Sequence, residues 1–273
     1  VSSGRTQLDQ LSMMARVNYR LMDKYLLTLT ARRDGSSVFG AQNKWGTFPS
    51  VALAWIASNE AFLENSNLID FLKFRVSYGT IGNQGLNPYS SINRLNTTQY
   101  VFGPNSPTIV GLRPSQMANE NLGWETSVTA NLAVDFGLLN DKINGTIELY
   151  RSNVDDLLLN RAIPATNGFP SVLQNIGSTR NQGIELSFNT INVKKSNFTW
   201  MSDLMFTSNR NEITSLYGID ADGDGVEDDD IANAWFIGEP VLIEFGLESD
   251  GIWQVGDDIP APFAPGDARF KDI

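Results

Sequence analysis

The feature that most constrains this chain is a two-residue alternation of apolar and polar side chains that recurs over long segments. In residues 11–21 apolar side chains stand at every second position, and Arg16, Asn18 and Arg20 are among those between them. Successive side chains of a β-strand point to opposite faces, so this segment predicts a strand with one apolar and one polar face. The pattern returns near residues 25–32, 51–55, 72–78, 126–136, 143–149, 184–189 and 199–206. We expect about ten such strands.

The connections between these segments differ in length in a regular way. Short turns are expected at residues 22–24, 137–141 and 191–196, and long connections rich in Gly, Asn, Pro and Ser at 34–46, 80–90, 98–122, 152–181 and 209–240. Short turns on one side and long loops on the other are typical of outer-membrane barrels, and long strands with polar inner faces suit a wide one. We therefore predict an all-β fold: part of an antiparallel transmembrane β-barrel of the outer-membrane type, with long extracellular loops.

Composition excludes several other classes of protein. The 273 residues include no Cys and no His, so the chain offers no disulfide, no thiolate or imidazole metal site and no Ser-His-Asp triad. The net charge of −11 argues against nucleic acid as a partner. No stretch approaches the roughly 18 apolar residues of a membrane helix. An enzyme is further disfavoured because adjacent carboxylates such as Asp155 and Asp156 would point to opposite faces of a strand.

Aromatic residues gather near the expected strand ends. They are Tyr19, Tyr25, Trp55, Tyr78, Trp124, Tyr150 and Trp200. Because Tyr and Trp are enriched at membrane–water interfaces, we interpret this set as an interfacial girdle. The alternative is ordinary β-propensity, since aromatic residues favour any strand.

Two further sets of residues are candidates for contact with a transported molecule. Charged residues on the polar strand faces are expected to line the lumen or to contact a plug; they are Arg16, Arg20, Arg32, Arg75, Glu148 and Glu185. Aromatic residues in the long loops could stack on a sugar, because an aromatic ring offers an apolar face to a pyranose. These candidates for substrate contact are Trp45, Tyr89, Tyr100 and Trp235. They could equally pack beneath a lid or against neighbouring loops.

The sharpest local motif is an acidic stretch at residues 220–230, inside the long loop 209–240. Asp stands at its first, third, fifth and ninth positions and Gly at the sixth, which matches the opening of a calcium-binding loop. The twelfth position is Ile231, where an EF-hand has a bidentate Glu. The candidate Ca²⁺ ligands are therefore Asp220, Asp222, Asp224 and Asp228, and a solvated acidic loop is the alternative. No cofactor is expected to be required.

A series of short motifs accompanies these strands in order along the chain. The longest is NKWGTFPSVALAW at residues 43–55. The others are LKFRVSYG (72–79), GNQG (82–85), NENLGWET (119–126), DDLLL (155–159), IP (163–164), NIG (175–177), NQGIE (181–185), IGEP (237–240) and PGDARFKD (265–272). Each is loose by itself, but the ordered set closely resembles the SusC/RagA type of TonB-dependent outer-membrane transporter.

The resemblance implies an uptake system in the outer membrane of a Gram-negative, Bacteroidota-like cell. Such transporters have a wide barrel, an N-terminal plug that occludes it, and a SusD-type surface lipoprotein that serves as a lid. TonB acts through the N-terminal parts, and the cargo is an oligosaccharide or a peptide. Against this pattern residues 1–273 correspond to part of the barrel, surrounded by outer-membrane lipid. We expect the plug domain and the last strands to lie outside this sequence.

One alternative comes from a different functional class. A secreted or cell-surface β-rich module for binding or adhesion would use the acidic loop, stabilised by calcium, and the aromatic loops. Strand length separates the two hypotheses, because a soluble module does not need ten-residue apolar faces on every strand.

Overall fold

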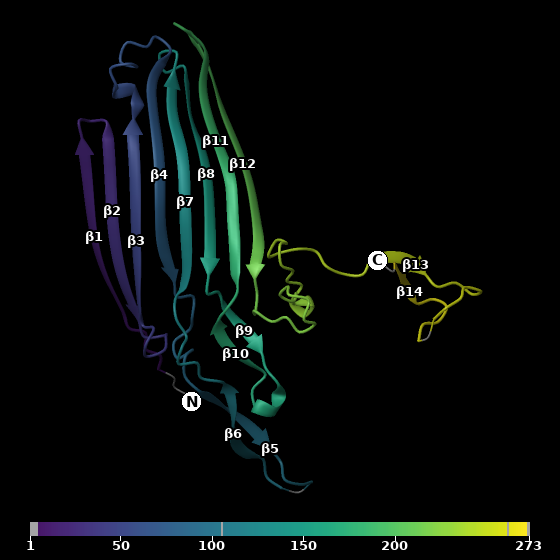
Figure 1. The fold of residues 1–273 in the computed structure, drawn as a ribbon. Helices are drawn as coiled ribbons and strands as arrows, with labels where there is room; N and C mark the ends of the chain where they lie inside the picture. The colour runs from purple at the N-terminus through teal and green to yellow at the C-terminus, as the bar shows by residue number, and fades with distance from the viewer. Residues whose placement is uncertain (1–4, 105, 261, 272–273) are drawn as a thin grey trace.

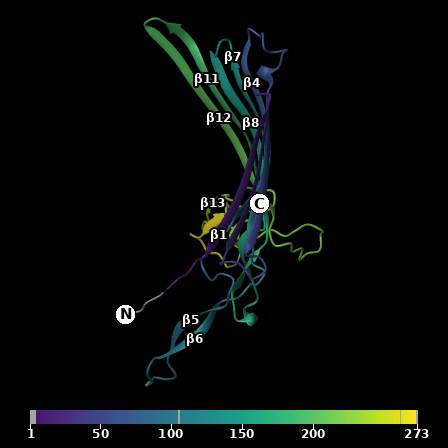
Figure 2. The same cartoon turned by 90° about the vertical axis from the view of Figure 1, so that its left-hand side faces the viewer.

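The computed structural model describes residues 5–104, 106–260 and 262–271. Eight strands form one antiparallel sheet in the order β1-β2-β3-β4-β7-β8-β11-β12 (Figure 1). Their bounds are β1 (Gln10–Leu21), β2 (Tyr25–Ser36), β3 (Trp45–Ile56), β4 (Ile69–Asn83), β7 (Glu125–Leu138), β8 (Ile143–Asp155), β11 (Ser178–Lys195) and β12 (Phe198–Ser215). Seen from its edge the sheet is curved (Figure 2). Each strand pairs with the strands that precede and follow it in the sheet, so the topology is an up-and-down meander.

The register of the strands gives the sheet two distinct faces, as the alternation predicts. One row of cross-strand neighbours is apolar in all eight strands; it consists of Leu21, Tyr25, Trp55, Phe74, Val134, Ile147, Leu186 and Phe206. We call the side that carries this row the apolar face and the opposite side the polar face. Large side chains of the apolar face are widely exposed: the exposed fraction is 50% for Leu53 and 52% for Leu132.

The connections at one end of the sheet are short, and we call this the short-turn end. Residues 22–24, 139–142 and 196–197 link strand pairs there, so the strands run slightly further than predicted. Met22 and Asp23 both have positive φ, which is the geometry of a type I′ hairpin turn. The fourth connection, residues 57–68, is longer and begins with the 3₁₀-helix η1 (Ala57–Asn59).

A single carboxylate ties the longer of these connections to the first hairpin. Glu60 accepts hydrogen bonds from Lys24 Nζ at 2.8 Å, Tyr25 OH at 2.8 Å and Trp55 Nε1 at 3.2 Å. These donors stabilise the ionised form and lower the pKa of Glu60 to about 2. The short-turn end is therefore held by an ion pair and two aromatic donors.

The opposite end carries the long connections, and we call it the loop end. Two of them fold into hairpins: β5 (Arg94–Tyr100) with β6 (Ile109–Gln116), and β9 (Leu158–Ala162) with β10 (Ser171–Asn175), the latter joined through η2 (Ala165–Asn167). The segment after β12 holds η3 (Ile231–Asn233) and the hairpin of β13 (Ser249–Ile252) and β14 (Ala268–Phe270). None of the helices in the described residues has the length and apolar character needed to cross a membrane.

These hairpins account for the difference between the predicted and observed strands. The expectation was about ten strands separated by loops, whereas the described residues hold eight long strands and three short hairpins. The β9–β10 hairpin lies inside the expected loop 152–181, the β5–β6 hairpin only partly inside 98–122, and the β13–β14 hairpin beyond 209–240. The acidic loop also begins later than residue 209, because β12 continues to Ser215. There the strand is polar, and Arg180 of β11 bonds Glu212 at 2.9 Å. The last predicted motif ends at Asp272, which lies outside the described residues.

A small hydrophobic core lies at the loop end. Val38, Phe39 and Leu122 are almost fully buried, and Leu86, Trp124, Leu158 and Leu173 pack against them. These residues come from three connections that are far apart in the sequence. We call the assembly of residues 37–44, residues 117–124 and the β9–β10 hairpin the loop cluster.

Asparagine side chains connect the parts of the loop cluster through main-chain groups. Asn43 Nδ2 donates to the carbonyl of Asn121 at 2.7 Å, and Asn119 Nδ2 donates to that of Leu173 at 2.8 Å. The side chain of Asn175 accepts from Gly123 N at 2.7 Å and donates to Gly123 O at 2.9 Å. An amide is suited to this role because it offers both donors and an acceptor. The asparagines of the motifs at 43, 119–123 and 175 therefore have a structural role, because they connect the loops to one another.

Gly40 illustrates how closely the loop cluster is packed. Its N–H donates to Leu122 O at 2.9 Å. A Cβ at this position would lie 1.8 Å from the carbonyl oxygen of Glu120, so no larger residue fits without moving the main chain.

Candidate functional site

The candidate functional site is the polar face of the sheet, above all its part nearest the loop end. Strand register places the six predicted lumen residues on this one face. Arg20 and Arg75 belong to the same cross-strand row as Glu148 and Glu185. Arg16 lies on the same strand and the same face as Arg20. Its cross-strand partner is Thr30, and Arg32 is on the same face as Thr30 because the two are separated by two positions in β2. The structure thus shows that these six side chains lie on the polar face, whereas their contact with a transported molecule stays a prediction.

The charged groups near the centre of the polar face pair with one another. Arg75 forms two hydrogen bonds to Asp135, with Nε at 2.8 Å and Nη2 at 3.0 Å. Thr146 donates to the same carboxylate at 3.0 Å, and Glu148 lies 3.7 Å from Arg75 Nη2. Lys73 Nζ lies 3.8 Å from the same carboxylate, so this cluster of β4, β7 and β8 holds two positive and two negative charges. Arg20 is similarly paired with Asp23, at 2.9 Å, near the short-turn end.

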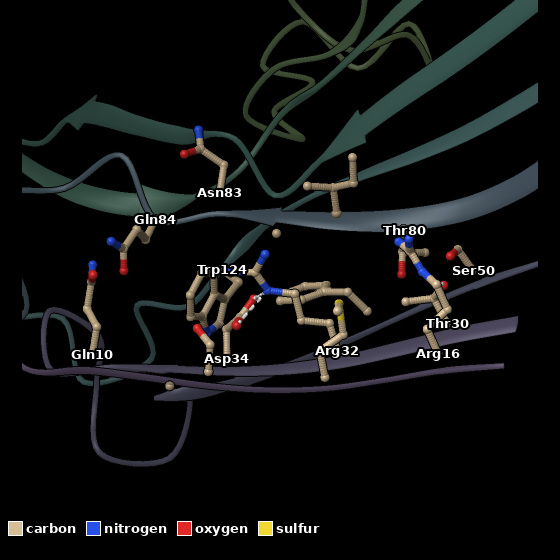
Figure 3. Close-up of a pocket in the computed structure, with 16 residues that line it drawn as sticks. Gln10, Arg16, Thr30, Arg32, Asp34, Ser50, Thr80, Asn83, Gln84 and Trp124 are labelled. Carbon is tan, nitrogen blue, oxygen red and sulfur yellow. Dashed lines mark hydrogen bonds and ion pairs between the residues drawn. The ribbon is translucent and has the colours of Figure 1, made fainter.

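A cavity of about 430 Å³ opens on the polar face toward the loop end (Figure 3). Its lining comes from β1, β2, β3 and the end of β4, together with Trp124 just before β7. Arg16 and Arg32 both line it, and Arg32 Nε bonds Asp34 at 2.7 and 2.8 Å. Side-chain amides of Gln10 and Gln84 and the hydroxyl of Ser50 add neutral hydrogen-bonding groups. The cavity can therefore hold a polar molecule that also carries charge.

An aromatic pair forms one wall of this cavity. The rings of Phe48 and Trp124 meet edge to face with their centroids 5.5 Å apart, and Trp124 Nε1 donates to Lys44 O at 3.3 Å. The Phe48 ring lies over two glycines, since a Cβ on Gly46 or Gly82 would come within 2.3 or 2.0 Å of it. Sequence reasoning missed this wall. The sequence does contain Phe48, Gly46 and Gly82 within the motifs at 43–55 and 82–85. That the phenylalanine ring packs over both glycines cannot be predicted without the register of the strands.

The four aromatic residues predicted to contact substrate lie in separate parts of the molecule. Trp45 begins β3, on the strand face shared with Val51 and Leu53, and Arg33 stacks over its ring at 5.3 Å. Tyr89 accepts a hydrogen bond from Gln7 N at 3.1 Å through its hydroxyl. Tyr100 ends β5 and meets Phe102 edge to face at 4.7 Å. Trp235 exchanges main-chain hydrogen bonds with Asp230 in the segment after β12.

The predicted aromatic girdle needs correction at two positions. Tyr25, Trp55 and Tyr78 lie on the apolar face, and a position at a membrane interface stays a prediction for them. Trp124 instead packs into the loop cluster against Phe39, with ring centroids 4.7 Å apart. Tyr150 lies on the polar face and donates to Asn209 at 3.0 Å. Both were assigned from their proximity to strand ends, which does not report the direction of the side chain.

The acidic loop brings three of the four candidate calcium ligands together. One carboxylate oxygen from each of Asp220, Asp222 and Asp224 lies within 4.8 Å of the others. Asp220 also accepts from the N–H groups of Gly223 and Gly225, and these main-chain donors lower its pKa. Asp228 lies outside this group and accepts from Ala221 N at 2.8 Å. The loop thus has a defined shape made by its own main chain, and calcium binding stays a prediction.

The acidic loop is anchored to the end of β12 by its own carboxylates. Glu227 accepts hydrogen bonds from Ser215 Oγ at 2.8 Å, Leu216 N at 2.7 Å and Gly218 N at 2.6 Å. Tyr217 OH donates to Asp230 at 2.6 Å. Burial, together with this carboxylate, raises the pKa of Tyr217 to about 12. These contacts fix Glu227 and Asp230 as structural groups of the loop.

The sequence matches a known family model. The family is described as TonB dependent receptor-like, beta-barrel, and the match covers residues 1–256. Among curated proteins, the TonB-dependent receptor P26 of Formosa agariphila is 39% identical over 272 residues, which is 96% of this chain and 27% of that protein. The TonB-dependent receptor SusC of Bacteroides thetaiotaomicron is 41% identical over 221 residues, covering 79% of this chain and 22% of SusC.

Solved structures contain the same arrangement of strands. A chain of the RagAB peptide transporter superposes with a TM-score of 0.77 at 28% identity, over 90% of this chain and 26% of that one. The RagAB peptide importer in its closed-closed state gives a TM-score of 0.76 over 96% of this chain and 28% of that one. The present chain therefore spans about a quarter of the length of the relatives it matches.

Proposed function

This chain belongs to the TonB-dependent receptor β-barrel family, and we propose that it forms part of the wall of an outer-membrane transporter. The transporter takes up bulky nutrients, oligosaccharides or peptides, through the barrel lumen. It works with a SusD-like lipoprotein at the cell surface and draws energy from TonB. No covalent bond is made or broken in this process.

The observation that carries this proposal is the open, two-faced sheet. β1 and β12 end the strand order, so each has one edge without a neighbour in the described chain. Unpaired edges of long strands are a liability unless further strands cover them. Pairing these edges with strands elsewhere in the whole protein would close a barrel, with the apolar face toward lipid and the polar face toward the lumen.

The energetics of the apolar face favour the transporter over a secreted binding module. Leu53, Val76 and Leu132 are cross-strand neighbours in the middle of the sheet, and each is about half exposed. A water-soluble protein rarely leaves so long an apolar surface uncovered. In a bilayer the same surface is stabilised by lipid chains, because the hydrocarbon interior is as apolar as the side chains themselves.

The names of the relatives support a peptide cargo and dependence on TonB. Their names associate SusC with TonB dependence and RagAB with peptide transport. We extend both properties to this chain as part of the proposal, with TonB coupling through parts of the whole protein outside this chain. The alternative oligosaccharide cargo and the lipoprotein lid rest on the family resemblance of the sequence motifs.

Growth of the source bacterium tests the proposed function. The full gene is deleted, and growth is measured on single polysaccharides and on protein digests as sole nutrient. We expect a defect on at least one of them, and the same defect in a strain that lacks TonB. Wild-type growth on every nutrient, with the protein located outside the outer membrane, would contradict the proposal.

We also propose calcium binding at Asp220, Asp222 and Asp224. The support is the approach of their carboxylates to within 4.8 Å and the preference of Ca²⁺ for clustered oxygen ligands. Titration of the full-length protein with Ca²⁺ by calorimetry tests it. A heat of binding that disappears in Asp222→Asn is expected, and no heat in the wild type would refute it.

A further inference from the structure

We propose that the cavity lined by Arg16 and Arg32 binds a carboxylate group of the cargo. The carboxylate belongs either to a uronate residue of an acidic oligosaccharide or to the C-terminus of a peptide. This inference rests on the proposed transport function and narrows its cargo to molecules that carry an acidic group.

The positions of the two arginines carry the inference. Arg16 pairs with Thr30 across the first hairpin, and Thr30 is two residues from Arg32 on the same face. Arg16 and Arg32 are therefore diagonal neighbours on adjacent strands, and the main chains of such a pair lie about 7–8 Å apart. Both side chains line the cavity of about 430 Å³.

The charges around the cavity do not balance. Asp34 pairs with Arg32 at 2.7 Å, whereas no carboxylate of the described residues lies within ion-pair distance of Arg16. The lining residues thus carry two positive charges and one negative charge, in a protein whose net charge is −11. A bound anion would compensate the excess positive charge of these lining residues.

The geometry of Arg16 suits a carboxylate. Its Nε already donates to Thr30 Oγ1 at 3.2 Å, which leaves the two terminal nitrogens for a ligand. A planar guanidinium binds a carboxylate with two parallel hydrogen bonds, and this pairing is stronger than bonds between neutral groups.

The remainder of the cavity fits the body of such a ligand. Gln10, Gln84 and Ser50 offer neutral donors and acceptors for hydroxyl or peptide groups. Trp124 offers an aromatic surface on the same cavity, suitable for a pyranose ring or an apolar side chain. Figure 3 shows the arginines, Asp34 and Trp124 directed into the space between the strands.

Retention of defined mixtures by the purified full-length transporter with its lipoprotein tests the proposal. One mixture is a partial hydrolysate of pectin and alginate, and the other is a tryptic digest of casein. Each is offered intact and after conversion of its carboxyl groups to neutral amides, and retained molecules are identified by mass spectrometry. We expect retention from at least one intact mixture and a loss of about tenfold or more after amidation. The mixture that is retained identifies the source of the carboxylate.

Variants of the same full-length protein locate the effect. Arg16→Gln should weaken retention about tenfold or more, while Arg16→Lys, which keeps the charge but not the two-pronged geometry, should fall between it and the wild type. Arg151→Gln is the matched control, because it removes the same charge from the opposite face of the sheet. A heat-modifiable gel shift confirms that each variant is folded.

The outcomes separate this inference from the proposed function. Equal retention of intact and amidated mixtures, no retention from either mixture, or an equal effect of Arg16→Gln and Arg151→Gln would overturn the carboxylate site. If TonB-dependent import of a nutrient persists in that case, the transport function stands without it. If no TonB-dependent import exists at all, the proposed function fails first.

Discussion

The eight-stranded sheet and the loop cluster are stabilised in different ways. In the sheet, most side chains are exposed or half-buried, and the strands are joined by main-chain ladders and by polar side-chain pairs such as Arg75 with Asp135. In the loop cluster, Val38, Phe39 and Leu122 are buried as in a water-soluble protein, and asparagine amides satisfy main-chain groups. The difference indicates that the loop cluster brings its own core, whereas the sheet depends on what surrounds it.

The largest expected effect comes from removing the centre of the loop cluster. Leu122 is fully buried, so Leu122→Ala leaves a cavity and should cost about 2–5 kcal/mol of local stability. Hydrogen exchange of the full-length protein in detergent should show faster exchange at 37–44 and 117–124, with the strands unchanged. Leu149→Ala, at a half-exposed position on the apolar face, is the control. Equal exchange in both variants would mean that the loop cluster has no stability of its own.

The next effect tests whether the sheet depends on lipid. Val17 and Asn18 are adjacent, both exposed, and point to the apolar and polar faces of β1. Val17→Arg should cost about 2–4 kcal/mol on insertion into lipid vesicles, because it places a charge in hydrocarbon. Asn18→Arg should insert almost as well as the wild type. The fraction folded is read from the heat-modifiable gel shift, and the opposite ranking would reverse our assignment of the faces.

A smaller effect is expected from the asparagine network. Asn175→Ala removes the reciprocal hydrogen bonds with Gly123 and leaves main-chain groups without partners, a cost of about 2 kcal/mol. Proteolysis between the sheet and the β9–β10 hairpin should become faster. Asn160→Ala, in the same hairpin at an exposed position, supplies the control. If the two variants are cleaved at the same rate, the network contributes shape without stability.

The sequence predicts the sheet better than it predicts the loop cluster, and the reason is physical. Strand faces follow from a two-residue period, so Arg16 and Arg75 could be assigned to one face before any contact was known. The loop cluster depends on contacts between residues more than fifty positions apart, such as Gly123 with Asn175. No local pattern reports such a contact, and Trp124 was therefore assigned to a membrane interface when it packs among the loops.

The acidic loop was predicted only in part for the same reason. The spacing of Asp220, Asp222 and Asp224 suggested convergence, and their carboxylates do approach one another. Asp228 has the right spacing, but its carboxylate accepts a main-chain hydrogen bond from Ala221. A local motif predicts the relative positions of residues that one tight turn joins. It does not predict those of residues further along the chain, such as Asp228.

The smallest effect concerns the short-turn end, where the carboxylate of Glu60 joins the connection at 57–68 to the first hairpin. The pKa of Glu60 is lowered to about 2 by hydrogen bonds from Lys24, Tyr25 and Trp55. Because the folded pKa lies below the ordinary value of 4.5, its stabilisation is present above pH 4.5 and is lost as the pH falls toward 2. Hydrogen exchange at 22–26 and 57–60, corrected for the intrinsic pH dependence, should show this loss in the wild type. Glu60→Gln keeps the shape without the charge and should show lower protection that no longer changes over this range.

The loop cluster, held by neutral amides and apolar contacts, should be insensitive to the same change in pH. A parallel loss of protection at both ends would show that the two are coupled through the strands, and the division of the molecule into two separately stabilised regions would fail.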